Sequence, residues 1–293
     1  MEQSIGVVLR QQIKAGLVQE NALLGAFRES SQKMDENGLI DLPTEELVRR
    51  TCDLVEGLAP SGAALAAVGL AVPGMVNDGV IEDCPNLPQL KGAKIAQELS
   101  AALRARGLDV PVTLCNDADA EAAGIAATRR ELDRRICVWT IGHGIGFGRH
   151  PYTAGAWEGG HMVVTLDPRE RYCGCGGKGH LEGIMGHRAM RLRFLDMEPH
   201  EVFVAAKNGD KRCAEFVDLW HRALAAATAS QIHLEGPGRF YYTGRDIDRL
   251  DLDRLRQYLE EMVKLSPLQS YAVEVLPEEH SRAVIGAAVI ATL

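Results

Sequence analysis

Residues 110–132, VPVTLCNDADAEAAGIAATRREL, contain the pattern that indicates the fold class most directly. Val110 to Cys115 is an apolar run that predicts a buried strand, and Asp117 to Leu132 is Ala-rich and predicts a helix. Arg135 to Ile141 then predicts another strand. Strand–helix–strand alternation of this kind predicts an α/β protein with buried sheets.

The rest of the chain continues the same alternation. Thr44 is expected to cap the first helix, with Glu45 and Glu46 in its first turn, where acidic residues suit the helix dipole. The charged run Arg245 to Arg254 is typical of a solvated surface. The other predicted strands are Ser4 to Leu9, Ile13 to Val18, Ala66 to Val72 and Phe240 to Tyr242, with Ala22 to Glu29 as a further candidate, and the other predicted helices are Ala93 to Arg106, Cys213 to Ser230 and Ala283 to Leu293.

Composition narrows the classes of function. The 293 residues carry a formal net charge of −8, which argues against a nucleic-acid partner, because binding a polyanion needs clustered Lys and Arg. The longest small and apolar run, residues 62–74, is too short to span a bilayer, and the N-terminal segment lacks the features of a secretion signal. Seven cysteines are an odd number for a disulfide framework, so we expect a cytoplasmic protein with mostly reduced thiols.

The first candidate for chemistry is Asn116-Asp117, at the carboxyl end of a predicted strand. Ligands bind at this edge of the sheet in α/β proteins. A carboxylate there could accept a proton from a substrate hydroxyl while the neighbouring amide fixes the orientation of the substrate. The alternative is that Asp117 only caps the helix that follows, since Asp is a favoured N-cap residue.

A second candidate is a cluster of cysteine and histidine. His161 is followed twelve residues later by Cys173-Gly174-Cys175, and His180 lies five residues beyond. Two Cys and two His can close a tetrahedral zinc shell, and the intervening glycines let the backbone bend around the ion. Four protein ligands leave no open position, so such a site would be structural. A redox pair or plain surface thiols are the alternatives.

The third candidate is the glycine-rich stretch Gly142-His143-Gly144-Ile145-Gly146-Phe147-Gly148, which follows a predicted strand. Bare backbone amides can approach phosphate oxygens closely. A hairpin that needs unusual backbone torsions explains the glycines equally well.

Taken together, these segments resemble the ROK family (repressor, open reading frame, kinase) in order and spacing, over nearly the whole chain, most of all its glucokinases and N-acetylmannosamine kinases. The matching segments are Ala71-Val72-Pro73-Gly74 with Pro85-Asn86-Leu87-Pro88, Asn116-Asp117, Glu158-Gly159-Gly160-His161, and Cys173 to Glu182, which is similar to the family signature Cys-Gly-Cys-Gly-x-x-Gly-Cys-x-Glu. His180 stands where the family has its third cysteine, and imidazole is also a zinc ligand.

The resemblance implies a role for each matching residue. Asp117 would be the catalytic base that takes the proton of the attacking sugar hydroxyl. The residues that would bind the other hydroxyls are Asn86, Asn116, Glu158, His161 and Glu182. His161 would also bind zinc through its second ring nitrogen, and the residues on the nucleotide side would be Gly142, His143, Gly144, Gly146 and Gly244.

One segment departs from the family pattern. Family kinases have Asp-x-Gly-Gly-Thr in the turn of the first hairpin, where the glycines wrap the nucleotide phosphates and the Asp helps to hold magnesium. The corresponding positions here are Val8, Arg10, Gln11 and Gln12. Phosphoryl transfer depends on positioning and on charge neutralisation, so this loss affects the donor side.

Two functions are compatible with this pattern. The first is a kinase that uses Mg-ATP to phosphorylate a hexose, an amino sugar or a related cyclic polyol. The second is a non-catalytic sugar-binding or regulatory pseudokinase; ROK repressors carry a helix-turn-helix, for which this sequence shows no segment. The resemblance implies a two-lobed actin-like ATPase fold with an interlobe cleft, lobes of residues 1–118 plus 283–293 and 119–282, and a homodimer.

Overall fold

The protein, described by a computed structural model at residues 2–30, 38–60, 64–155 and 157–293, divides into two units. Unit 1 comprises Met1–Ile136, Gly148–Trp157 and Glu279–Leu293, and unit 2 comprises Cys137–Phe147 and Glu158–Glu278. Residues 62–63 of the apolar run lie outside the described ranges. Within those ranges, none of the helices combines the length and the apolar character that crossing a bilayer requires.

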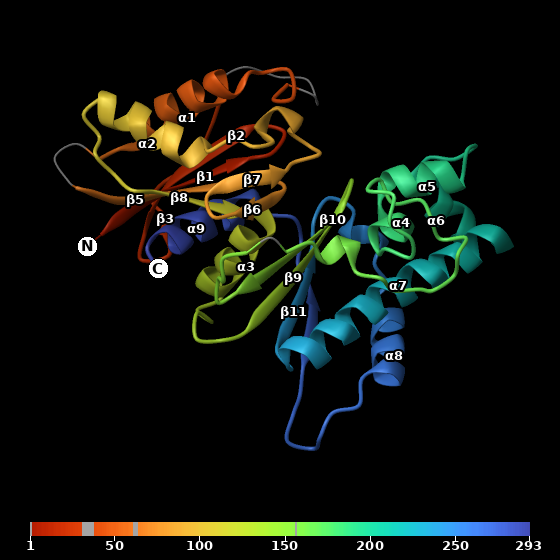
Figure 1. Ribbon diagram of the computed structural model, residues 1–293. Coiled ribbons are helices and arrows are strands. Elements are labelled where there is room, and N and C mark those ends of the chain that lie inside the picture. The colour runs from red at the N-terminus through yellow and green to blue at the C-terminus, as the bar shows by residue number, and fades with distance from the viewer. Residues whose placement is uncertain (1, 31–37, 61–63, 156) are drawn as a thin grey trace. The chain divides into compact units, whose positions relative to one another are not determined.

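Unit 1 is built on a six-stranded sheet (Figure 1). The strand order is β3-β2-β1-β5-β8, and β4 pairs with β2. β1 and β2 form an antiparallel hairpin, whereas β5 runs parallel to both β1 and β8. The strands are β1 (Gln3–Leu9), β2 (Ile13–Gln19), β3 (Ala22–Leu23), β4 (Arg28–Glu29), β5 (Leu65–Val72) and β8 (Val112–Asn116), and a separate hairpin joins β6 (Met75–Asn77) to β7 (Val80–Asp83).

The two faces of this sheet carry side chains of different size. Ile5, Val7 and Leu70 belong to a core with α1 and α2, while α3 and α9 cover the opposite face (Figure 1). On that opposite face a Cβ on Gly6 or Gly69 would collide with the backbone of α9. Small residues therefore let α9 lie directly against the strands. The helices of unit 1 are α1 (Thr44–Leu58), α2 (Ile95–Ala105), α3 (Asp117–Thr128) and α9 (His280–Ala291), with the short turn η1 (Pro88–Leu90).

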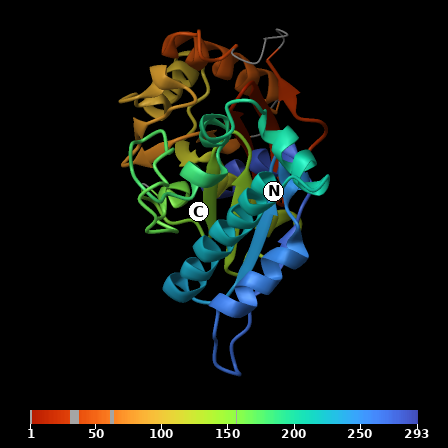
Figure 2. The same ribbon diagram turned by 90° about the vertical axis from the view of Figure 1, so that its right-hand side faces the viewer.

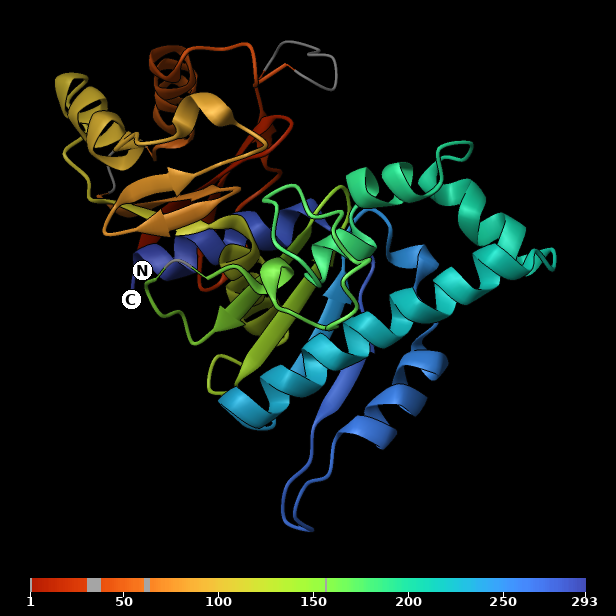
Figure 3. The ribbon, with the colours of Figure 1, turned by 45° about the vertical axis from the view of Figure 1, so that its right-hand side comes forward.

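Unit 2 is built on a four-stranded sheet in the order β10-β9-β11-β12, in which β11 and β12 are parallel. Residues 148–150, the second half of β10, belong to unit 1. Its long helix α7 runs beside α8 (Figures 2 and 3). Trp139, Trp220 and Phe240 are buried in the core of this unit. The elements are β9 (Ile136–Ile141), β10 (Ile145–His150), β11 (Arg239–Thr243), β12 (Ala272–Val275), α4 (Glu182–Met185), α5 (His187–Arg193), α6 (Pro199–Lys207), α7 (Lys211–Glu235), α8 (Leu252–Met262), η2 (Gly159–His161) and η3 (Ile247–Arg249).

The α/β class is confirmed, and three local expectations are corrected. Thr44 is the first residue of α1 and not its N-cap, which is Pro43; the Thr44 hydroxyl donates instead to the carbonyl of Gln89. The candidate strand Ala22 to Glu29 is split into β3 and β4, and Gly25 between them adopts a φ of +81°.

The third correction concerns the charged run Arg245 to Arg254, which is not simply a solvated surface. Asp246 in this run is buried. It is paired with His187 and Arg249, and these two partners make its burial possible.

The two units differ in their bounds from the lobes expected from the sequence. The expected boundary at residue 118 divides the junction of β8 and α3, whereas the whole of α3 belongs to unit 1. The reason is the close packing of α3 on α9, in which a Cβ on Gly124 or Gly286 would collide with the backbone of the other helix.

Candidate functional site

Asp117 lies at the tip of β8, where the strand passes into α3. The cap of α3 is Asn116, whose side-chain oxygen accepts a hydrogen bond from the amide of Ala118 at 2.8 Å. The interpretation of Asp117 as a helix cap is therefore wrong. The carboxylate of Asp117 makes no capping hydrogen bond and can bind another partner.

That partner is Arg10, in the turn between β1 and β2. Arg10 Nε donates to Asp117 Oδ2 at 2.6 Å, and Arg10 Nη2 donates to the main-chain carbonyl of the same residue at 3.4 Å. The side chain of Asp117 is 19% exposed. Its second oxygen, Oδ1, has no hydrogen-bond partner among the described residues.

The segment around Pro73-Gly74 lies beside Asn116 in unit 1. Asn116 Nδ2 donates to the carbonyl of Gly74 at 2.8 Å, and the thiol of Cys84 donates to the carbonyl of Pro73. Gly74 adopts a φ of +131°, and a Cβ there would collide with the carbonyl of Asp83, so only glycine fits this turn. Both polar atoms of Asn116 are thus used within the protein.

Asn86 differs from Asn116 in this respect. It is exposed, and within the described ranges its side chain makes no hydrogen bond. Of the two asparagines expected to contact a sugar, Asn86 is the one with an available amide.

Two further carboxyl groups lie on α3 behind Asp117. Burial raises the pKa of Asp119 to about 7, and the amide of Arg149 donates to its Oδ1 at 2.9 Å, which partly opposes the rise. Burial also raises the pKa of Glu121, which is paired with Arg282 at 2.9 Å. Neither residue was identified from the sequence, because an Asp or Glu within an Ala-rich helix carries no signal of its own.

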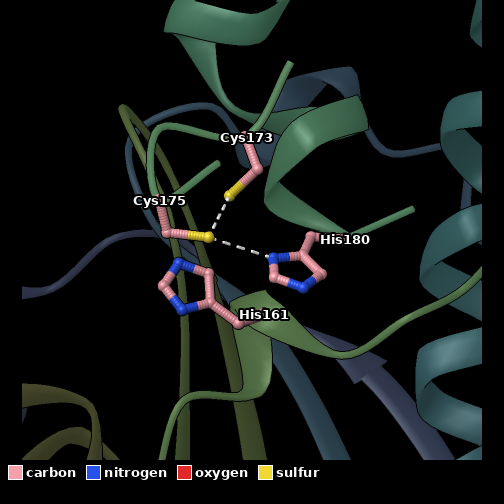
Figure 4. A group of neighbouring side chains, drawn as sticks. All are labelled: His161, Cys173, Cys175 and His180. Atoms are coloured by element: carbon pink, nitrogen blue, oxygen red, sulfur yellow. Dashed lines mark hydrogen bonds between the residues drawn. The ribbon is translucent and has the colours of Figure 1, made fainter. Parts of the chain in front are cut away.

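In unit 2 the structure brings together the four predicted metal ligands. One ligand atom from each of His161, Cys173, Cys175 and His180 lies within 4.8 Å of every other (Figure 4). The two sulfur atoms are 3.4 Å apart, and Cys175 Sγ is 3.3 Å from His180 Nδ1. Two sulfur and two nitrogen donors at this spacing fit a tetrahedral zinc ion and leave no open position on it.

The loop around this cluster is shaped by glycine. Gly176 and Gly179 adopt φ values of +86° and +70°. Such torsions turn the chain sharply between Cys175 and His180, as expected from the sequence.

His161 connects the metal cluster to Glu158. One ring nitrogen of His161 faces the sulfur of Cys175 (Figure 4), and Nδ1 lies 3.9 Å from Glu158 Oε2. Glu182 approaches the same region, since a Cβ on Gly160 would lie 3.6 Å from its Oε2. That oxygen also accepts a hydrogen bond from the amide of Ile145 at 3.0 Å.

The glycine-rich stretch is a hairpin between β9 and β10. The amide of Gly142 donates to the carbonyl of Gly144, which closes the turn. Neither glycine has a positive φ, so the expectation of unusual backbone torsions is wrong at these two positions. At Gly144 the reason is close approach, because a Cβ there would lie 2.7 Å from the carboxylate of Glu182.

The segment after β11 reaches the start of this hairpin. Gly244 adopts a φ of +116°, and a Cβ there would lie 2.5 Å from the carbonyl of Ile141. Arg245 Nη1 donates to Nε2 of the exposed His143 at 3.2 Å. The predicted nucleotide-side residues of both segments therefore lie together in unit 2.

A buried carboxylate with two basic partners lies next to this hairpin, and it was not predicted from the sequence. His187 Nε2 is 2.6 Å from Asp246 Oδ2, and Arg249 Nη2 is 2.7 Å from Asp246 Oδ1. Burial alone would raise the pKa of Asp246, but the hydrogen bond with His187 and the charge of Arg249 hold it below its usual value. The rings of His143 and His187 meet edge to face at 5.0 Å.

Known proteins resemble this chain in sequence. It is 27% identical to a glucokinase of Thermotoga maritima, over 88% of this chain and 89% of that protein. It is 30% identical to a kanosamine kinase of Amycolatopsis mediterranei over 62% of each. It is 28% identical to an N-acetylmannosamine kinase of Haemophilus influenzae over 56% of this chain and 57% of that protein.

Solved structures resemble it in fold. A ROK hexokinase from Thermus thermophilus superposes with a TM-score of 0.73 at 23% identity, covering 99% of this chain and 98% of the other. A ROK glucokinase from Streptomyces griseus, solved with glucose and AMPPNP, gives 0.68 at 22% identity, with 99% of each chain covered. The fold is accordingly the actin-like ATPase fold of these kinases. The model of the ROK family matches residues 13–293, and the chain therefore belongs to the ROK family.

Proposed function

We propose that this protein is a sugar kinase, which transfers a phosphoryl group from ATP to a hydroxyl of a hexose, an amino sugar or a related cyclic polyol. Family membership and the names of the kinase relatives support the reaction class. The single observation that carries the proposal is the carboxylate of Asp117, partly exposed at the tip of a parallel strand with one oxygen unpartnered among the described residues.

In this proposal Asp117 is the general base. Its carboxylate takes the proton of the attacking hydroxyl as that oxygen bonds to the terminal phosphorus of ATP, the bond to the bridging oxygen breaks, and ADP leaves. In unit 1, Asn86 binds a further hydroxyl of the sugar, and Asn116 acts mainly by fixing the junction of β8 and α3. In unit 2, Glu158, His161 and Glu182 bind hydroxyl groups.

The donor side is assigned to unit 2. Gly142, His143, Gly144, Gly146 and Gly244 are proposed to contact the phosphates of ATP, with magnesium entering as part of the Mg-ATP substrate. The short segment joining β1 and β2 offers no carboxylate for a metal ion.

Zinc is proposed as a structural ion held by His161, Cys173, Cys175 and His180. When bound, it would supply a fixed geometry and take no part in proton or phosphoryl transfer. It would hold the ring of His161 with Nδ1 directed toward Glu158, so that both side chains keep their positions for the sugar.

The test is ADP release from Mg-ATP with a panel of hexoses, amino sugars and cyclic polyols. We expect turnover with at least one sugar, and a loss of roughly 10²–10⁴-fold in the Asp117→Asn variant, which keeps the size of the side chain but removes the base. If no sugar gives turnover above that of the variant, the proposed activity is wrong.

The β1–β2 hairpin favours a second candidate, the pseudokinase. Val8, Arg10, Gln11 and Gln12 stand at the positions of the family's phosphate loop, and Arg10 pairs with the proposed base. A pseudokinase would be stabilised against heat by a sugar and not by ATP. Measurable ATP affinity would exclude it in favour of the kinase.

A further inference from the structure

Four charged side chains of alternating sign lie along α3 and its neighbours in unit 1. Arg282, at the start of α9, pairs with Glu121 at 2.9 Å, and both side chains are almost completely buried, at 6% and 4% exposed. Arg10, from the β1–β2 turn, pairs with Asp117 at 2.6 Å and is 32% exposed.

The periodicity of α3 joins these two pairs. Asp117 and Glu121 are four residues apart, so their carboxylates lie on one face of the helix, one turn apart. Burial raises the pKa of Glu121, and the positive charges of Arg10 and Arg282 both oppose this rise. The charge of Arg10 thus acts on both carboxylates, and the charges alternate in sign in the order Arg282, Glu121, Arg10, Asp117.

Stability alone does not explain such a group. The desolvation of buried ions offsets most of their mutual attraction, so apolar side chains of similar volume stabilise a fold equally well. Around these charges the packing consists of small apolar residues, among them Ala71, Cys115 and Ala283, which shows that the interface of α3 and α9 is otherwise apolar. The charges therefore point to a function at their partly exposed end, which is the pair of Arg10 and Asp117.

Arg10 constrains Asp117 at two points. Its Nε holds the side-chain oxygen Oδ2, and its Nη2 approaches the main-chain carbonyl of the same residue. A guanidinium group that bonds to two atoms of one residue restricts the rotation of the carboxylate. The oxygen left over is Oδ1, which no described residue contacts by a hydrogen bond.

From this geometry we infer that Arg10 is a positioning residue for phosphoryl transfer, which holds Oδ2 of Asp117 so that Oδ1 is presented to the acceptor hydroxyl. The inference rests on the proposed function. The proton of the hydroxyl passes to Oδ1, Arg10 keeps its charge throughout, and no further reactant is needed. In the family, the turn of the first hairpin contacts the nucleotide phosphates. In this protein, the same turn orients the base.

The test compares the variants Arg10→Met and Arg10→Lys with a matched control, Arg106→Met. Arg106 is also in unit 1, is 30% exposed, and bridges two carboxylates, Asp53 and Glu56, on the surface. We expect kcat to fall roughly tenfold to hundredfold in Arg10→Met, as for a lost charge-assisted hydrogen bond, with KM for the sugar and for ATP changed less than about threefold. Arg10→Lys should lie between Arg10→Met and the wild type, and Arg106→Met should match the wild type.

Chemical rescue separates positioning from a merely structural role. A further variant, Arg10→Ala, leaves space for a free guanidinium ion. This ion at millimolar concentration should restore part of the kcat of Arg10→Ala and have no effect on Arg106→Met. An unchanged kcat in Arg10→Met overturns the inference, and so does a rise in KM for ATP at constant kcat, which would make Arg10 a ligand of the donor. If the wild type is inactive with every sugar, both the proposed function and the positioning role fail. If the wild type is active and the Arg10 variants have the same kcat, only the positioning role fails.

Discussion

Replacing Asp119 with asparagine should stabilise the protein at neutral and alkaline pH. Asp119 is buried, and burial raises its pKa from 3.8 to about 7. Because its pKa in the folded state lies above the unfolded value, the protonated carboxyl stabilises the fold fully below about pH 4. That contribution is lost as the pH rises through 7.

The size of the effect follows from the pKa. A rise from 3.8 to about 7 corresponds to roughly 4 kcal/mol between the two pH limits. The asparagine oxygen can still accept the hydrogen bond from the amide of Arg149, and the amide group does not ionise. We therefore expect Asp119→Asn to raise the free energy of unfolding by about 2–4 kcal/mol at pH 8 and to change it by less than about 1 kcal/mol at pH 4.

The assay is urea denaturation followed by circular dichroism at several values from pH 4 to pH 8. The control is Asp109→Asn, which changes a carboxyl group of unit 1 that is 76% exposed. This control should show the pH dependence of the wild type. A variant Asp119→Asn that is less stable than the wild type at pH 8, or that shows the same slope against pH, would refute the reasoning.

Three other changes test the buried pair, the metal cluster and the nucleotide-side turn. Glu121→Gln should lower the free energy of unfolding by about 3–5 kcal/mol, because it removes one charge of a buried ion pair and keeps the other, on Arg282, away from water; equal urea midpoints would contradict this. Cys175→Ala should abolish stoichiometric zinc, measured by elemental analysis, and lower Tm, while Cys213→Ser should retain the metal; zinc in both variants would argue against the proposed ligand set. Gly244→Ala should cost at least about 1–3 kcal/mol in thermal unfolding, because its φ of +116° and the nearby backbone of β9 exclude a Cβ; an unchanged Tm would show that this turn can relax.

Much of the fold could be predicted from patterns within single elements. The strand before Asn116 and the helix after it were predicted because apolar runs and alanine-rich segments specify local structure directly. The clustering of His161 with Cys173 was also predicted, since the ligands occur in two short, glycine-rich segments. The chemical roles of these residues stay predictions.

The remaining features depend on contacts between distant segments. Arg10 reaches Asp117 across 107 positions of the chain, and His187 reaches Asp246 across 59. A local reading assigned Asp117 a possible capping role and Asp246 a solvated surface, because both are common for an Asp considered alone. Only the tertiary fold supplies the partner that makes burial of such a residue possible.

The placement of α9 has a consequence for synthesis of the protein. This helix covers β1 and β5, at the centre of the first sheet, yet it follows all of unit 2 in the chain. On the ribosome, the part of that sheet face which α9 covers must therefore stay uncovered while the segment Glu158–Glu278 of unit 2 is translated. A nascent chain stalled within unit 2 would expose that face to chaperones, and release of the final helix would end the exposure.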